Sequence, residues 1–253
     1  MRFLLTRRWL VFAVVVALLA WLAVVLGDWQ FRRLDEREAA NRQLAANLGA
    51  SPLPVSELMR VGQAPSSSDQ WRRVTATGEW DDEHTVVIRY RTRDGKPGVD
   101  VVTPLRTRHG VVLVDRGWLA ADNNGATRPN IPATSSGTVT VSGYLRLDAA
   151  GSSAKVTDLS ARAISSVEIA KVLPYGDQVL GGFVNLARES PPPSQSLEPL
   201  SLPEPGNGPH FFYGLQWWFF SGLAIAGFIY LVWDERRRLL RERAAQEADR
   251  ETS

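Results

Sequence analysis

Two uncharged, apolar stretches decide the fold: WLVFAVVVALLAWLAVVL at residues 9–26 and FFYGLQWWFFSGLAIAGFIYLVW at residues 211–233. As helices rising about 1.5 Å per residue, they would be about 27 Å and about 35 Å long. Helices of this length cross a hydrocarbon core about 30 Å thick, the longer one with a tilt. The sequence therefore predicts transmembrane helices over residues 9–26 and, with His210 in the first turn, over residues 210–233.

Arginines outside the two spans predict the orientation. Arg2, Arg7 and Arg8 precede the first span, and further arginines follow the second at positions 236, 237, 238, 241 and 243. Short basic flanks stay in the cytoplasm, whereas long loops are translocated largely regardless of charge. We therefore expect a multi-pass protein of the plasma membrane. Residues 1–8 and the basic tail 234–253 would be cytoplasmic, and the central region would be extracytoplasmic.

Two other interpretations of the first stretch are weaker. A cleaved signal peptide usually has a shorter apolar region and a small-residue cleavage site, and no clear site follows this run. Thr6-Arg7-Arg8-Trp9-Leu10 faintly resembles a twin-arginine export signal. Arginine pairs before a span mostly serve only to orient it, so a membrane anchor is favoured.

The composition excludes several classes of function. Cysteine is absent, which excludes disulfides, cysteine-ligated zinc, iron–sulfur clusters and a cysteine nucleophile. Only three histidines are present, too few for a metal centre built mainly from histidines. Residues 27–210 hold 20 Lys and Arg against 21 Asp and Glu. We therefore expect no nucleic-acid binding, and the basic tail suits anionic lipid instead.

Residues 27–189 are expected to form one extracytoplasmic α+β domain. A helix continues out of the first span over residues 28–48, and short helices are expected at 54–60 and 166–173. Alternation with a period of two, rich in Val, Thr, Trp and Tyr, predicts strands at 71–80, 85–91, 99–107, 111–119 and 138–147. Turn signals at 93–96 and 108–110 favour a mainly antiparallel sheet, which can curl into a small barrel.

Three further segments complete the prediction. Residues 181–187 can supply one more strand, and residues 122–137 are typical of a long surface loop. Residues 190–209 contain seven prolines among Ser, Leu and Glu, so neither a helix nor a central strand can form there. The sequence predicts a stiff, extended tether over these residues.

His210 is the strongest candidate for a ligand-binding residue. Gly208-Pro209 is a good helix start, which places His210 in the first turn of the second span. The positive end of the helix dipole disfavours imidazolium and favours a neutral ring. Four residues follow on the same stripe of the helix: Tyr213, Gly214, Trp217 and Ser221. This pattern suits an axial haem ligand. From the residues alone, however, an interfacial histidine whose aromatic neighbours pack on the first span is the favoured interpretation.

Other motifs allow plain structural interpretations. Arg32 and Arg33 follow Trp29 at the first membrane exit, where they suit an interfacial anchor or face a partner or an anionic ligand. Residues 112–118, VLVDRGW, end a strand with a charged turn, for which a structural role is favoured. His84 and His109 allow a membrane-tethered hydrolase as an alternative, but no Gly-x-Ser-x-Gly elbow accompanies them.

Separated motifs occur in a fixed order along the chain. They are Leu26-Gly-x-Trp-Gln-x-Arg-Arg, Arg73-Val-x-x-x-Gly78-x-Trp80-Asp81, Val101-Val-Thr-Pro104, Val114-x-Arg116-Gly117-Trp118, Gly143-x-Leu-Arg146 and His210-x-x-Tyr213-x-x-x-Trp217. In this order, and between two anchors, they resemble the surfeit locus protein 1 family, the membrane factors for cytochrome c oxidase assembly. The resemblance covers roughly residues 7–233, of which residues 151–187 match poorly.

The resemblance implies a non-enzymatic assembly factor for an aa3-type cytochrome c oxidase. Such a factor would bind haem a and assist its insertion into the catalytic subunit, its protein partner. His210 matches the proposed haem contact of the family. On this hypothesis Tyr213 and Trp217 pack on the macrocycle, while Arg32 or Arg33 meets its propionates. The alternative is a membrane-anchored scaffold that binds oxidase subunits and holds no cofactor.

Overall fold

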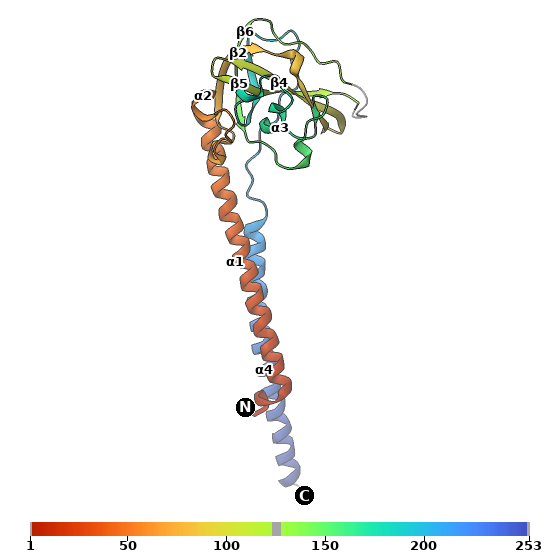
Figure 1. Ribbon diagram of the computed structural model, residues 1–253. Coiled ribbons are helices and arrows are strands. Elements are labelled where there is room, and N and C mark those ends of the chain that lie inside the picture. The colour runs from red at the N-terminus through yellow and green to blue at the C-terminus, as the bar shows by residue number, and fades with distance from the viewer. Residues whose placement is uncertain (1, 123–127, 252–253) are drawn as a thin grey trace. The chain divides into compact units, whose positions relative to one another are not determined.

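The computed structural model describes residues 2–122 and 128–251, and the chain divides into two compact units (Figure 1). One unit comprises Met1–Asn41 and Gly206–Ser253, and the other comprises Arg42–Pro205. The loop predicted at 122–137 therefore includes residues 123–127, which lie outside the described part. The same holds for residue 1 of the N-terminal segment and residues 252–253 of the tail.

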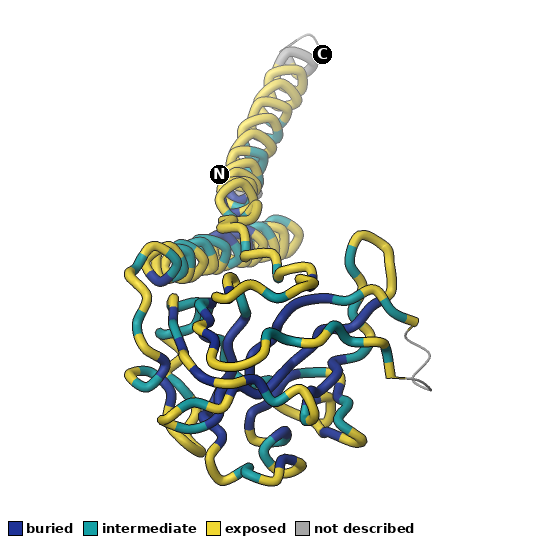
Figure 2. The backbone as a smooth tube through the Cα atoms, turned by 90° about the horizontal axis from the view of Figure 1, so that it is seen from above, coloured by how far each residue is buried: buried dark blue, intermediate teal, exposed yellow. Residues whose placement is uncertain are grey.

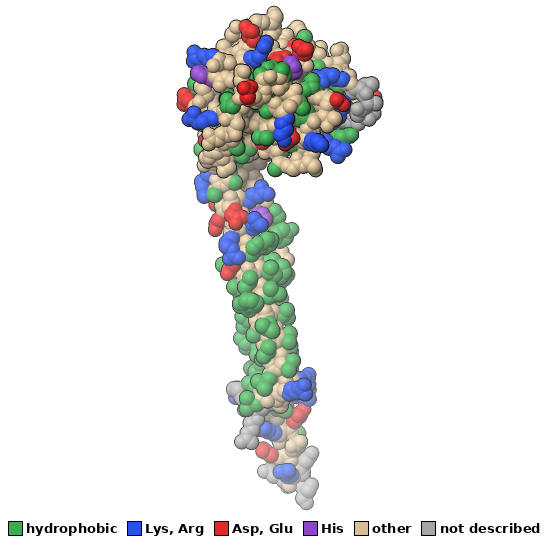
Figure 3. Space-filling model, viewed as in Figure 1, with side chains coloured by type: hydrophobic (Ala, Val, Ile, Leu, Met, Phe, Trp, Pro, Cys, Tyr) green, Lys and Arg blue, Asp and Glu red, His purple; other side chains and the backbone are tan. Residues whose placement is uncertain are grey.

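Two long helices make up the first unit. A short 3-10 turn, η1 (Arg2–Leu5), precedes α1 (Arg7–Gly49), and α4 spans His210–Glu251. Both helices are long and apolar enough to cross a membrane, and α1 continues without a break through the helix predicted at 28–48. Figure 3 shows hydrophobic side chains along the pair, with charged side chains at both ends.

Small residues form the seam between the two helices. α1 buries Ala20, Ala23 and Gly27, and α4 buries Gly214 and Ser221. Spacings of three, four and seven residues place each set on one helix face. Small side chains allow membrane helices to approach closely. The larger apolar side chains on the other faces stay exposed.

The helix pair is antiparallel. His210, the first residue of α4, contacts Gln30 of α1. About five turns further along α4, Phe228 packs on Trp9 and Phe12, with ring centroids 6.2 and 5.5 Å away. The contacts thus run in opposite directions along the two helices.

The second unit is built around a closed barrel of five strands, whose ring order is β2–β6–β8–β5–β4, with β4 pairing back to β2. All neighbours in the ring are antiparallel except β5 and β8. The mainly antiparallel sheet and its closure are therefore confirmed. Closure leaves few free strand edges. The strands are β2 (Arg73–Trp80), β4 (Lys96–Thr107), β5 (Gly110–Ala120), β6 (Thr138–Arg146) and β8 (Phe183–Ser190).

Further strands flank the ring. β3 (Val86–Arg93) forms a hairpin with β4 through the turn predicted at 93–96. The short strands β1 (Leu53–Pro54) and β7 (Ser160–Ala161) pair in parallel with β2 and β3. The strands predicted from the period-two pattern are all present, with ends shifted by a few residues.

Short helices and turns complete the unit. The predicted short helices are confirmed as α2 (Val55–Leu58) and α3 (Ser166–Ala170), both shorter than expected. α3 begins where the Ser165 hydroxyl accepts a hydrogen bond from the Glu168 amide. The remaining 3-10 turns are η2 (Ser67–Asp69), η3 (Asp82–His84), η4 (Ser152–Ala154) and η5 (Gly176–Gln178).

The apolar core lies on both faces of the central strands, and Figure 2 shows the buried backbone concentrated there. Val112 and Val114 of β5 belong to the cluster inside the barrel. Leu113, between them, packs with Ile169 of α3 in a second cluster. Burial on both faces explains why residues 111–114 form a continuous apolar run rather than an alternating one.

The proline-rich segment does more than connect the barrel to α4. Ser190, the first residue of the tether predicted at 190–209, is the last residue of β8, and residues 191–209 form no helix or ladder strand, as expected. Leu197 is nevertheless buried, and Glu198 forms an isolated β-bridge with Trp118 of β5. Residues 197–199 therefore also pack on the barrel, which the sequence did not predict.

Candidate functional site

The start of α4 creates the first candidate site. Gly208 has a positive φ of 64°, which turns the chain into the helix. The carbonyl of Pro209 accepts a hydrogen bond of 3.1 Å from the Tyr213 amide and closes the first helical turn. His210 is the first residue of α4, as the Gly-Pro pair predicts.

Gln30 of α1 orients the His210 ring. The Nδ1 atom of His210 lies 2.8 Å from Oε1 of Gln30. Because a carbonyl oxygen only accepts hydrogen bonds, Nδ1 carries the proton and donates it. With Nδ1 engaged in this way, Nε2 is the ring nitrogen left to act as a metal ligand.

The Nε2 edge of the ring faces a glycine. A Cβ atom built on Gly208 would lie 3.3 Å from Cδ2 and 3.4 Å from Nε2 of His210. Within the described residues, Nε2 has no hydrogen-bond partner. Gly208 thus lies against this edge of the ring without adding a side chain there.

The residues of the stripe predicted below His210 differ in their surroundings. Gly214 and Ser221 are buried in the seam against α1, as the packing interpretation requires. Tyr213 is 48% exposed. Trp217 is half-buried and stands perpendicular to Phe220, with 6.0 Å between ring centroids. The Tyr213 ring is therefore accessible, and in the part of the chain that the structure describes neither Tyr213 nor Trp217 makes a hydrogen bond or ring contact with His210.

A second group of aromatic rings near His210 was not predicted. Phe31 of α1 lies 4.8 Å from the Trp218 ring and 6.2 Å from the Phe211 ring, centroid to centroid. It also covers Gly214, where an added Cβ would be 2.9 Å from the Phe31 ring. Sequence reasoning missed Gln30 and Phe31 as site residues. The available signal was the Trp-Gln pair inside the first motif.

The two arginines of the prediction differ in their surroundings. Arg33 forms an ion pair of 2.9 Å with Glu36, and its guanidinium lies 5.8 Å from the Trp29 ring centroid. Arg32 is exposed and has no ion-pair partner in the described part of the chain. Neither is bonded to His210. Arg33 stands one helical turn beyond Gln30, on the same side of α1.

The other two histidines lie in the barrel unit, in separate places. His84 Nδ1 is 2.9 Å from Oδ2 of Asp81, and the Tyr175 hydroxyl donates to the same carboxylate. Burial raises the pKa of Asp81, but the hydrogen bonds from Tyr175 and His84 outweigh it and leave the pKa below its ordinary value. His109 accepts from Arg108 in an exposed turn. In the described residues, no serine hydroxyl bonds to either ring.

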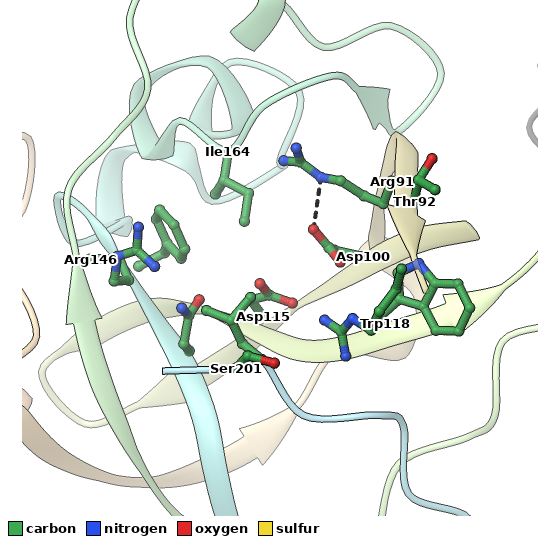
Figure 4. Close-up of a pocket in the computed structure, with 12 residues that line it drawn as sticks. Arg91, Thr92, Asp100, Asp115, Trp118, Arg146, Ile164 and Ser201 are labelled. Carbon is green, nitrogen blue, oxygen red and sulfur yellow. Dashed lines mark ion pairs between the residues drawn. The ribbon is translucent and has the colours of Figure 1, made fainter. Parts of the chain in front are cut away.

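A charged cavity of about 380 Å³ is the second candidate site (Figure 4). Burial, and then the charge of Asp100, raises the pKa of Asp115 to about 7. Burial also raises the pKa of Asp100, although Arg91 forms an ion pair of 2.8 Å with it. The sequence patterns did not predict this cavity.

Asn185 connects the buried carboxyl group of Asp115 to the partly buried guanidinium of Arg146. In the amide orientation that satisfies both neighbours, its nitrogen donates to Asp115 at 3.2 Å and its oxygen accepts from Arg146 at 3.0 Å. Burial lowers the pKa of Arg146, and the charge of Asp115 offsets part of this effect. The arrangement holds charge of both signs in the barrel wall, beneath Ile164 and beside Trp118.

Comparison with known proteins identifies similar sequences. The sequence model of the SURF1 family matches residues 17–222. Uncharacterized SURF1-like proteins of Mycobacterium bovis and Mycobacterium tuberculosis are 32% identical over 248 residues, which cover 96% of this chain and 90% of each relative. A SURF1-like protein of Rickettsia felis is 29% identical over 112 residues, 43% of this chain and 46% of the relative.

Proposed function

The chain belongs to the SURF1 family, known generally as oxidase assembly factors, and from this premise we propose that it assists the assembly of an aa3-type cytochrome c oxidase. In this proposal it binds haem a and passes it to the catalytic subunit of the oxidase, without catalysing a reaction itself. Family membership confirms the resemblance seen in the ordered motifs. It supports the assembly role, and the haem role rests on the geometry at His210.

The hydrogen bond between Gln30 and His210 is the observation that carries the haem proposal. It engages Nδ1 and leaves Nε2 available, beside a glycine that adds no side chain. Such a nitrogen could ligate a haem iron, and aromatic side chains could pack on the flat apolar macrocycle. The residues present therefore fit the group: one histidine nitrogen, accessible aromatic rings and nearby arginines.

The chain's own residues would act in distinct ways. His210 supplies the ligand nitrogen, and Gln30 holds its tautomer and its ring orientation. Tyr213, about half exposed and one turn further along α4, offers an aromatic face, with Trp217 below it. Arg32 or Arg33 provides a cation for carboxylates at headgroup depth. Because Arg33 already pairs with Glu36, Arg32 is the less constrained of the two.

The location in the cell is part of the proposal. We place both termini in the cytoplasm and the barrel unit outside it, with α1 and α4 crossing the plasma membrane. The arginine flanks support this orientation, and the small-residue seam supports helix pairing inside a bilayer. An apolar haem would then reach His210 from the lipid or its interface.

Absorption spectroscopy tests the haem role. The full chain is purified in detergent from cells that make haem a, alongside His210→Ala and the matched control His109→Ala. We expect a Soret band in the wild-type chain and in the control, and its loss or shift in His210→Ala. An identical spectrum in His210→Ala would exclude this histidine as the ligand. A haem-free wild-type chain whose deletion still impairs oxidase assembly would favour the scaffold alternative.

A further inference from the structure

Arg116-Gly117-Trp118 lies inside β5, at a β-bulge opposite Val101 and Val102, so the charged turn expected at the end of this strand is wrong. These residues build a cleft that holds residues 197–199. The backbone of Trp118 exchanges two hydrogen bonds with Glu198, of 2.8 and 3.1 Å. This strand edge is open because β8 pairs with β5 only at Val114 and Asp115. We call residues 116–118, Arg93 and the apolar wall described below the strap cleft, and we call Leu197-Glu198-Pro199 the strap.

The glycine at the β-bulge allows the strap to approach closely. Gly117 has a φ of 129°, and a Cβ atom there would lie 2.4 Å from the carbonyl oxygen of Glu198 and 3.2 Å from the Cβ of Leu197. Any other residue at 117 would push the strap away. Arg116 points elsewhere, donating to the Pro132 carbonyl at 3.1 Å. The glycine is thus explained by the docked segment as well as by the bulge.

The strap cleft contacts the side chains of two adjacent residues of the strap. Leu197 is buried in a cluster with Val87, Val99 and Val101. Arg93 forms an ion pair of 3.0 Å with Glu198.

Arg93 also binds the strap's main chain. It donates to the Glu198 carbonyl at 3.2 Å and the Pro199 carbonyl at 2.9 Å. Its guanidinium lies 5.6 Å from the Trp118 ring centroid. A main-chain bridge, an apolar pocket and a charged anchor are the elements with which domains recognise extended peptides.

Two features limit how firmly the strap is held. Pro199 has no N–H, so the bridge cannot extend beyond Glu198 in that direction. The Glu198 side chain is 50% exposed, which weakens its ion pair by solvent screening. Covalent attachment raises the effective concentration of the strap and favours docking in cis. A competing segment with the same chemistry takes its place only when its concentration or its affinity outweighs this advantage.

We propose that the strap cleft is a recognition site for an extended segment of a partner protein, with an apolar residue followed by an acidic residue and proline. The strap occupies it in cis until such a segment displaces it. The inference rests on the proposed function only in requiring a protein partner. The chemistry of the cleft sets the partner class: Arg93 selects an acidic residue, and the valine pocket selects the apolar one.

Fluorescence anisotropy with a labelled peptide of sequence SQSLEPLSL, residues 194–202, tests the proposal on the full chain in detergent. The variant Leu197→Ser with Glu198→Gln frees the cleft and should bind the peptide about 10- to 100-fold more tightly than the wild type, the range expected for one buried leucine. Adding Arg93→Gln should weaken binding about tenfold. Arg108→Gln, an exposed arginine in another turn, is the matched control and should have no effect.

Several results would overturn the proposal. One is equal binding of a peptide whose Leu and Glu are replaced by Ser and Gln. Another is failure of the freed variant to bind SQSLEPLSL while its circular dichroism melt matches the wild type. If Leu197→Ser unfolds the barrel, the single variant Glu198→Gln replaces the double variant in the same binding experiment. Dimers of the wild type that Leu197→Ser dissociates would assign the cleft to a second copy instead. Haem absorption, measured on the same samples, reports separately on the proposed function.

Discussion

Nδ1 of His210 lies 2.8 Å from Oε1 of Gln30, which is 180 residues earlier in the chain. The bond joins the first turn of α4 to α1 at the end of the small-residue seam. It determines which ring nitrogen carries the proton and which one has the lone pair. A packing contact between two helices therefore also prepares a ligand atom.

Gln30→Ala should weaken haem binding without removing the ligand. Loss of the partner of Nδ1 frees the ring to rotate and to change tautomer, and losses of this kind cost about 10- to 100-fold in affinity. Titration of the purified chain with haem, followed by absorption, measures the effect. Gln43→Ala, elsewhere on α1, is the control because Gln43 bonds to Asn47 and Ser68 instead. Equal affinities of Gln30→Ala and the wild type would refute the orienting role.

Gly27→Val should separate the helix pair. A Cβ atom at Gly27 would lie 2.3 Å from the Trp218 ring, so the indole or the helix must move, at a cost of about 1–3 kcal/mol. Gly222→Val is the matched control, since nothing lies within 4 Å of a Cβ at Gly222. Trp fluorescence and thermal unfolding in detergent compare the two. If Gly222→Val perturbs the chain as much as Gly27→Val, close packing in the seam is not the reason for a glycine at position 27.

Asp115 should make the barrel unit less stable as the pH rises. Its pKa in the folded chain is raised to about 7, so the folded state holds a proton that the unfolded state releases near pH 4. Stability is then full below about pH 4 and is lost as the pH rises through about 7, by about 4 kcal/mol in all.

Asp115→Asn tests this expectation. The amide has no charge to bury, so its unfolding temperature between pH 5 and pH 8 should fall less than that of the wild type. Asp177→Asn, an exposed carboxylate, is the control and should follow the wild type. An equal fall in unfolding temperature for Asp115→Asn and the wild type would show that ionisation of Asp115 does not destabilise the folded chain.

Single cysteines test the proposed topology, because the natural chain has none. Asp94→Cys lies in the turn between β3 and β4, and Arg243→Cys lies near the end of α4. An impermeant maleimide should label Asp94→Cys in intact spheroplasts and Arg243→Cys only after lysis, because basic flanks stay in the cytoplasm. Labelling in the reverse order would place the barrel in the cytoplasm and remove the setting for the proposed function.

Local patterns predicted much of the structure. The uncharged runs near Trp9 and Phe211 lie in long helices, and the alternating strands and the turn at 93–96 are present. Gly208-Pro209 places the start of α4 at His210. These features depend on residues within a few positions of each other, so propensity, periodicity and turn chemistry suffice to predict them.

Local patterns predicted only part of the candidate site. His210 could be singled out because its helix start is local. Its partner Gln30 could not be singled out, because no local pattern in the sequence marks an amide on one helix as the partner of a histidine on another. Tyr213 and Gly214 lie on one predicted stripe, yet one is exposed and the other buried. A stripe specifies a helix face, and only the position of the second helix decides which part of that face is covered.

What the sequence by itself determined is the set of elements: two apolar helices, an alternating sheet, and a proline-rich return without regular structure. The tertiary structure alone decided the parallel pairing of β5 with β8, the burial of Asp115 and the docking of Leu197 beside Gly117. The physical reason is that these depend on contacts between segments far apart in the chain. Their free energy comes from desolvation and close packing, which appear only when the segments meet.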